Sequence, residues 1–106
     1  MSNYQVIRTD TADSHIFNLG LSLAEQFGFD VALQKVNELE RCILSLSDNP
    51  HLGTEPRYML LRRQGYKVLI TDKNLVFYKI DDIEHIVTIY AVVDQRQDYL
   101  SIILGL

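Results

Sequence analysis

A β-branched run in the last third of the chain ends abruptly in polar and ionic side chains. The apolar stretch VTIYAVV is followed by DQRQDY (94–99). Where a strand leaves the core, its end is a common place for a binding or catalytic site. Arg96 suits stabilisation of a phosphate, and Asp94, Asp98 or Tyr99 suits proton transfer. The competing interpretation is structural: Arg96 pairs with an aspartate to fix the strand end, and Tyr99 packs under the sheet.

Basic side chains gather in one part of an acidic chain. The 106 residues carry a net charge of −4. Residues 57–80, however, contain only one acidic residue, Asp72. A local basic surface attracts phosphates even on an acidic molecule, because salt screens charges beyond roughly 8 to 10 Å. The alternative is that these cations are solvated charges along exposed strands. They are Arg57, Arg62, Arg63, Lys67, Lys73 and Lys79.

The first half of the chain predicts a strand and a helical hairpin. Residues 4–8 are β-prone, and the Thr-Asp-Thr that follows can cap a helix. Apolar residues spaced by three and four predict a helix over 12–27, which Gly28 ends. Asp30 is predicted to cap a second helix, whose apolar stripe runs over 32–46. Two amphipathic helices joined by so short a link are expected to form an antiparallel hairpin.

The second half of the chain has the periodicity of strands. The segment SDNPHLGTEP (47–56) holds both prolines and breaks the helical pattern. Strands are predicted beyond it, with short turns that favour antiparallel neighbours. The final YLSIILGL suits a short helix or an extended arm. The predicted strands cover residues 58–63, 66–71, 75–80 and 86–93.

These elements predict one α+β domain over residues 1–106. It has two layers: an N-terminal strand and a helical hairpin that packs on an antiparallel sheet of about four to five strands. The second face of that sheet is then expected to stay partly open. Alternation along the strands would let this face present Arg57, Lys67, Thr88 and Tyr90.

Several classes of protein are disfavoured by the composition. No apolar run approaches 18 residues, so we expect no membrane span. The three histidines lack a second ligand at metal spacing, and no glycine-rich phosphate loop occurs, so we expect no metal and no cofactor. A single cysteine and the lack of an export-signal pattern predict a cytoplasmic protein.

The order of the elements and three motifs resemble the RelE/ParE superfamily of bacterial type II toxins. The motifs are L-x-D-N-P-x-x-G (46–53), Gly-Tyr-Lys (65–67) and Arg-x-Asp-Tyr (96–99). This resemblance covers nearly the whole chain. It implies a growth-arresting toxin held silent by a cognate antitoxin, which lays an extended or helical segment across the toxin. It leaves open whether the toxin forms a homodimer or a hetero-oligomer with the antitoxin.

The superfamily contains members that cut mRNA on the ribosome and members that poison DNA gyrase. For the first, the resemblance implies phosphate handling by Lys67 and Arg96. Two lysines of that branch are replaced here by Tyr58 and Leu60. The basic stretch nevertheless favours an mRNA-cleaving endoribonuclease, with gyrase inhibition or an inactive antitoxin-binding module as alternatives. For cleavage, the predicted catalytic residues are Lys67, Arg96 and Tyr99, and the predicted substrate contacts are Arg57, Arg62 and Tyr90.

Overall fold

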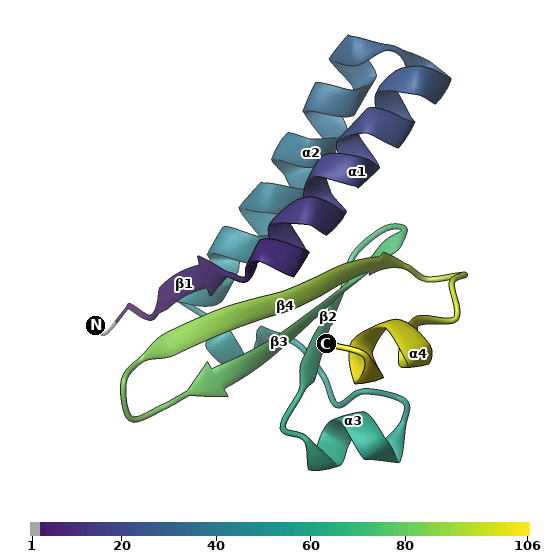
Figure 1. The fold of residues 1–106 in the computed structure, drawn as a ribbon. Coiled ribbons are helices and arrows are strands. Elements are labelled where there is room, and N and C mark those ends of the chain that lie inside the picture. The colour runs from purple at the N-terminus through teal and green to yellow at the C-terminus, as the bar shows by residue number, and fades with distance from the viewer. Residues whose placement is uncertain (1–2) are drawn as a thin grey trace.

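A strand and two long helices precede a meander of three strands (Figure 1). The computed structural model describes residues 3–106, so residues 1 and 2 of the predicted domain lie outside the described part. No helix in this part is both long and apolar enough to cross a membrane. The elements are β1 (Gln5–Arg8), α1 (Asp10–Phe27), α2 (Phe29–Leu44), the 3₁₀ turns η1 (Ser45–Ser47) and η2 (Pro50–Leu52), α3 (Met59–Arg63), β2 (Lys67–Ile70), β3 (Asn74–Asp81), β4 (Ile86–Asp94) and α4 (Tyr99–Leu104).

The helical hairpin forms as predicted. Thr9 Oγ1 accepts the N–H of Ala12 at 3.1 Å and caps α1. Gly28 ends α1 with φ +91°, a conformation that a side chain would strain. Because α2 begins directly at Phe29, Asp30 lies in its first turn and makes no cap, so that prediction is wrong. The hairpin reaches away from the sheet at its Gly28 end (Figure 1).

The sheet has the strand order β1-β4-β3-β2. The antiparallel meander of β2, β3 and β4 is confirmed, whereas β1 pairs with β4 in parallel, so the sheet is mixed. The strand predicted over 58–63 is wrong, because Met59–Arg63 form helix α3. This segment lacks the alternation of a strand, and its leucines, methionine and arginines favour a helix. The α+β class is confirmed, with four strands in the sheet.

Both faces of the sheet are covered by helices. The hairpin packs on one face, and α3 and α4 on the other. The second face is therefore less open than predicted, although Thr88 and Tyr90 remain half-buried on β4. Lys67 alternates with buried residues of the second face and lies on the hairpin side with Leu69. The two clusters are Ala12, Ile16, Leu39, Ile43, Leu46, Leu69, Val76, Tyr78, Val87, Ile89 and Val92 under the hairpin, and Leu61, Tyr66, Val68, Leu75, Phe77, Ala91, Val93 and Ile103 under α3 and α4.

A side chain of α1 supplies a hydrogen bond to β4 beyond the point where β1 ends. β1 ends opposite Ile89, and the ladder to β3 shifts at this point, which leaves Tyr90 as an extra, bulged residue. Beyond it, the N–H of Val92 donates to His15 Nδ1 at 3.1 Å. Partial burial lowers the pKa of His15 below 6.5. Neutral His15 therefore serves as a hydrogen-bond acceptor for an otherwise open strand edge.

The long loop wraps around the hydroxyl of Tyr78. This hydroxyl donates to the carbonyl of Pro50 at 2.9 Å and accepts the N–H of Gly53 at 2.9 Å. Tyr78 is fully buried, and its burial raises the pKa of the phenol. A Cβ on Gly53 would lie 2.5 Å from the Tyr78 oxygen and 2.6 Å from the carbonyl oxygen of Val68. Gly53 is therefore required because there is no room for a Cβ atom. Its backbone conformation is not the reason, since its φ of −72° suits any residue.

We predict that Tyr78→Phe lowers the free energy of unfolding by about 1 to 3 kcal/mol, because the buried carbonyl of Pro50 loses its donor and the part-buried N–H of Gly53 loses its acceptor. The thermal midpoint should fall by at least about 4 °C. Tyr66→Phe is the matched control, since its hydroxyl makes no hydrogen bond within residues 3–106. Thermal unfolding monitored by circular dichroism tests this, and equal midpoints for the two variants would refute it.

We predict that stability falls between pH 7.5 and pH 5 partly through His15. Its folded pKa lies below the unfolded value of 6.5, so the unfolded chain binds the proton more readily. The contribution is complete above the unfolded pKa and is lost as pH falls through the folded pKa. His15→Asn retains an acceptor near the Nδ1 position and should flatten this part of the pH profile. Parallel pH profiles for wild type and the variant would contradict the role of His15.

Candidate functional site

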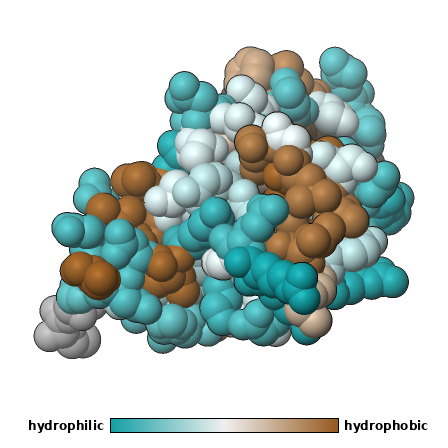
Figure 2. Space-filling view, turned by 60° about the horizontal axis from the view of Figure 1, so that its bottom comes forward, coloured by the Kyte–Doolittle hydropathy of each residue, from teal (hydrophilic) through white to brown (hydrophobic). Residues whose placement is uncertain are grey.

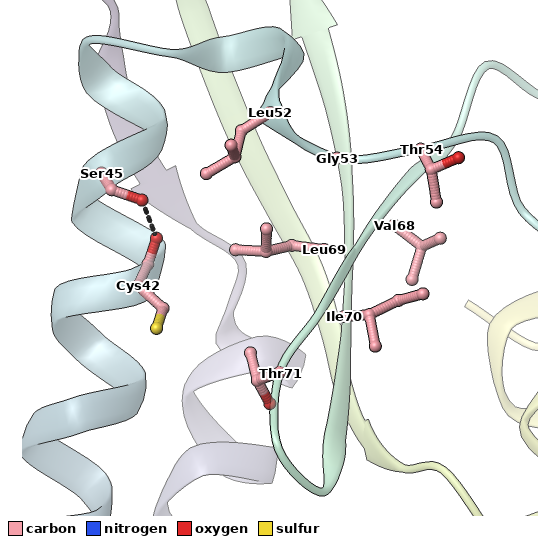
Figure 3. A pocket seen from close by; sticks show the side chains of 9 residues that line it. All are labelled: Cys42, Ser45, Leu52, Gly53, Thr54, Val68, Leu69, Ile70 and Thr71. Carbon is pink, nitrogen blue, oxygen red and sulfur yellow. Dashed lines mark hydrogen bonds between the residues drawn. The ribbon is translucent and has the colours of Figure 1, made fainter.

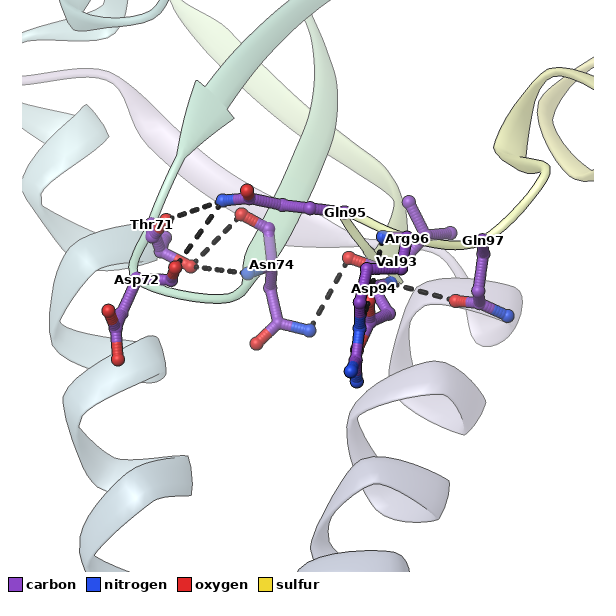
Figure 4. A network of polar contacts seen from close by, with 8 residues as sticks. All are labelled: Thr71, Asp72, Asn74, Val93, Asp94, Gln95, Arg96 and Gln97. Atoms are coloured by element: carbon purple, nitrogen blue, oxygen red, sulfur yellow. Dashed lines mark hydrogen bonds and ion pairs between the residues drawn. The ribbon is translucent and has the colours of Figure 1, made fainter.

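The polar cluster after β4 is a tightly bonded turn. The backbone N–H of Arg96 donates to Asp94 Oδ1 at 2.8 Å, and its guanidinium pairs with the same carboxylate at 3.1 and 3.2 Å. These bonds lower the pKa of Asp94. Gln97 accepts the N–H of Asp94 at 2.7 Å, and the N–H of Gln95 donates to the carbonyl of Lys73 at 3.0 Å. The cluster therefore fixes the end of β4 against the β2–β3 turn (Figure 4).

Lys67 lies elsewhere on the sheet. Its ammonium pairs with Glu55 at 2.9 Å, and its side chain is 30% exposed, against 89% for Arg96. Along β3, Lys67 is level with Tyr78, whereas Asp94 is level with Asn74. Four residues of strand correspond to about 13 Å, and two strand spacings separate them across the sheet by about another 10 Å. The structure does not bring Lys67 and Arg96 together.

Three further predicted site residues lie on the face covered by α3 and α4. Tyr99 begins α4, and its ring packs against Tyr58 at 5.6 Å and Phe77 at 5.3 Å between centroids. Burial raises the pKa of the Tyr99 phenol. The guanidinium of Arg57 lies 5.7 Å from the centre of the Tyr58 ring, and Arg62 Nε donates to the carbonyl of Pro56. Tyr99 is thus part of an aromatic core.

Tyr90 belongs to a second aromatic group, most of which the sequence analysis missed. Its ring meets that of Tyr66 edge to face at 5.5 Å. The ammonium of Lys79 lies 4.5 Å from the centre of the Tyr66 ring and 5.1 Å from that of Tyr90. Alternation along β3 places Lys79 on the same face as Phe77. Only the strand register, which the sequence does not reveal, brings these three side chains together.

A groove of about 490 Å³ runs between the hairpin and the turn that joins β2 to β3. Its hairpin side carries five apolar side chains, called here the apolar wall, together with Ser22, Gln26, Lys35, Glu38 and Cys42, and the opposite wall is polar. Phe27 is 58% and Val31 37% exposed there. The apolar wall includes Leu19, Leu23, Phe27, Val31 and Leu39, and the polar wall Thr71, Asp72, Lys73, Asn74, Asp94 and Arg96.

A second hollow, of about 460 Å³, lies between α2 and β2, the edge strand of the sheet. In Figure 3, Leu52 and Leu69 point toward α2, whereas Val68 and Ile70 point away from it. Cys42 and Thr71 line both this hollow and the groove, so the two are neighbours. Thr54 pairs with Val68 through two backbone hydrogen bonds of 2.9 Å and covers the edge of β2 at that residue.

The described part of the chain contains no cluster of side chains suited to binding a metal ion. Residues 3–106 contain no group of three histidine, cysteine, aspartate or glutamate side chains arranged to hold an ion. The nearest approach to one is Asp82, which accepts the hydroxyl of Tyr4 at 2.6 Å and lies 3.6 Å from His51 Nε2. The hydrogen bond from Tyr4 lowers the pKa of Asp82. This contact ties the N-terminus and the long loop to the β3–β4 turn.

Known protein structures share this fold. The chain matches the toxin–antitoxin complex RelBE2 from Mycobacterium tuberculosis with a TM-score of 0.67 and 21% identity, covering 92% of this chain and 97% of that one. A chromosomal ParDE system from P. aeruginosa matches with a TM-score of 0.72 and 13% identity, over 86% and 95% of the chains. The isolated E. coli RelE toxin matches with a TM-score of 0.57 and 15% identity, over 96% of each chain. No curated protein matches the sequence.

The sequence itself identifies the family. The model of the ParE toxin of the type II toxin-antitoxin system parDE matches residues 6–99. This match extends from the second residue of β1 to the first residue of α4 and so includes both helices of the hairpin and all but one residue of the sheet. The chain therefore belongs to the ParE family of toxins, the toxin components of type II toxin-antitoxin systems.

Proposed function

We propose that this toxin arrests growth by binding DNA gyrase, without cutting RNA. The observation that carries the proposal is the separation of Lys67 from Arg96. Cleavage of a phosphodiester needs its catalytic groups positioned around one phosphate. Here the two cations are far apart, and each already pairs with a carboxylate. Poisoning by binding has no such requirement, which supports the gyrase-inhibiting branch of the superfamily.

The ionisable groups near Arg96 support the same proposal. A general acid or base works best with a pKa near the operating pH. Hydrogen bonds from Arg96 lower the pKa of Asp94, and burial raises that of Tyr99. Both values move away from neutrality, so neither group is tuned for proton transfer at pH 7. These shifts fit a structural turn and an aromatic core.

Ribosome-associated mRNA cleavage is the second candidate. The side chain of Arg96 is 89% exposed, so a substrate phosphate has access to it. The cations between residues 57 and 80 would then supply binding energy for RNA, with Arg57, Arg62 and Tyr90 as contacts. This candidate requires Lys67 or another cation to reach the same phosphate as Arg96.

For the antitoxin, we infer that it occupies the groove between the hairpin and the β2–β3 turn. The similar structures from M. tuberculosis and P. aeruginosa are a toxin–antitoxin complex and a toxin–antitoxin system. The apolar wall exposes Phe27 and Val31, a liability for a free monomer. The polar wall opposite offers partners for charged side chains. An amphipathic helix or strand of the antitoxin matches both walls.

We predict that a short induction of the toxin blocks supercoiling and leaves transcripts intact. The measurement is a plasmid supercoiling assay together with mapping of RNA 5′ ends from the same culture. Relaxed plasmid with an unchanged set of RNA ends is the expected result, because a binding toxin acts on gyrase alone. New RNA ends within coding regions, with supercoiling unchanged, would refute gyrase binding and favour mRNA cleavage.

The double variant Lys67→Gln with Arg96→Gln serves as the control for this experiment. If the two cations only anchor their local turns, the variant should still relax the plasmid. Each exposed ion pair contributes only about 0 to 1 kcal/mol, so the fold should survive. Loss of RNA cleavage in this variant would instead identify the pair as phosphate-handling residues.

We predict that Val31→Asp weakens antitoxin binding by at least about tenfold, since it places a carboxylate on the apolar wall of the groove. The helix should tolerate an acidic residue in its first turn. Leu33→Asp is the matched control, because Leu33 is 51% exposed on the same helix but does not line the groove. Calorimetric titration with the purified antitoxin measures both. Equal affinities for the two variants would place the antitoxin elsewhere.

A further inference from the structure

Lys79 is held between two tyrosine rings on the face of the sheet opposite the hairpin. Its ammonium lies 4.5 Å from the Tyr66 ring centre and 5.1 Å from the Tyr90 ring centre. The rings meet edge to face at 5.5 Å, so they form a corner around the ammonium. The bulge at Tyr90 contributes to this corner, because it interrupts the regular alternation of β4.

The contacts of Lys79 leave its hydrogen-bonding capacity unused. Lys67 and Arg96 pair with carboxylates at 2.9 and 3.1 Å. Within residues 3–106, by contrast, no carboxylate lies within 4.0 Å of the Lys79 ammonium, and no acceptor hydrogen-bonds to it. A ring face attracts the charge but provides no oxygen for the three N–H donors. Lys79 is half-buried as a residue, and its ammonium, held by the two rings, has donors free for an external anion.

The surroundings of Lys79 indicate what kind of molecule carries that anion. Tyr66 is only 5% exposed, so its ring offers no open platform on which a nucleobase could stack. A single carboxylate on a protein surface needs no such platform.

Exposed apolar side chains lie on the helices of the same face. Figure 2 views the molecule from the side of α3 and shows a continuous hydrophobic area there. Met59 and Leu60 of α3 are 56% and 51% exposed, and Leu104 and Leu106 at the C-terminus 42% and 49%. Arg57 precedes α3 and Arg63 is its last residue, and both add positive charge. An apolar patch with cations around it complements a protein surface that carries carboxylates around apolar residues.

We propose that Lys79, held by Tyr66 and Tyr90, binds a carboxylate of the toxin's protein target, with the α3–α4 patch as the adjoining contact. This inference rests on the proposed function, because it assigns a surface to gyrase binding. It also places target binding on the face opposite the antitoxin groove. Lys79 contributes one charge-assisted contact, and the two rings limit the entropy lost when the contact forms.

The test compares Lys79→Gln with Lys79→Arg and with the control Arg41→Gln. Arg41 is an exposed cation on α2, on the hairpin side of the sheet, and it does not line the groove. For each purified variant, the affinity for gyrase, the inhibition of supercoiling, the antitoxin affinity and the thermal midpoint are measured. Lys79→Gln should weaken gyrase binding about 10- to 100-fold, the loss of one charge-assisted bond. Lys79→Arg should restore most of it, and antitoxin affinity should stay unchanged.

Each outcome discriminates between explanations. Wild-type protein that leaves gyrase unaffected overturns the proposed function and this inference together. An active wild type with an equally active Lys79→Gln variant overturns the inference alone. Reduced antitoxin affinity in Lys79→Gln overturns it too, because the carboxylate then belongs to the antitoxin. If Lys79→Gln unfolds, Lys79→Met keeps the aliphatic stem between the rings, and full inhibition by that variant refutes the proposal.

Discussion

The fold depends on one buried hydroxyl. Tyr78 lies on β3, inside the sheet, and its hydroxyl bonds the carbonyl of Pro50 and the N–H of Gly53, which fixes the long loop between α2 and α3 on the core. Directly after Gly53, Thr54 pairs with β2, and Glu55 reaches Lys67. Local structure therefore explains the D-N-P-x-x-G motif: Pro50 begins the 3₁₀ turn η2, where its missing N–H is not needed, and Gly53 leaves room for the phenol.

Elements that depend on neighbouring residues in the sequence could be predicted, whereas elements that depend on distant contacts could not. The hairpin follows from apolar periodicity and from Gly28, and the antiparallel meander from short turns, so both are confirmed. The helix at Met59–Arg63 is missed because it is only five residues long, too short for a helical period to stand out from the strands that follow it, although its residue types favour a helix. The parallel pairing of β1 is likewise a tertiary effect, since more than 70 residues separate Gln5 from its partner Ile86.

Clustering of cations in the sequence does not show that they form one site in the structure. The cations of residues 57–80 appear as one cluster in the sequence, yet they occupy different environments. Lys67 is neutralised by Glu55, Arg62 is bonded to a backbone carbonyl, and Lys79 is held by aromatic rings. Tyr90 could be named from its place on a strand, whereas its neighbours Tyr66 and Lys79 depend on register and on a bulge.

The sheet separates the two proposed binding surfaces, which constrains how an antitoxin silences this toxin. A segment confined to the hairpin groove would leave Lys79 uncovered on the opposite face. The groove, however, adjoins the hollow beside β2, because Cys42 and Thr71 line both. That hollow extends to Thr54, five residues before the start of α3. An antitoxin chain that follows this track to the edge of β2 ends beside the α3–α4 face, so it excludes a large target protein from that face without contacting Lys79.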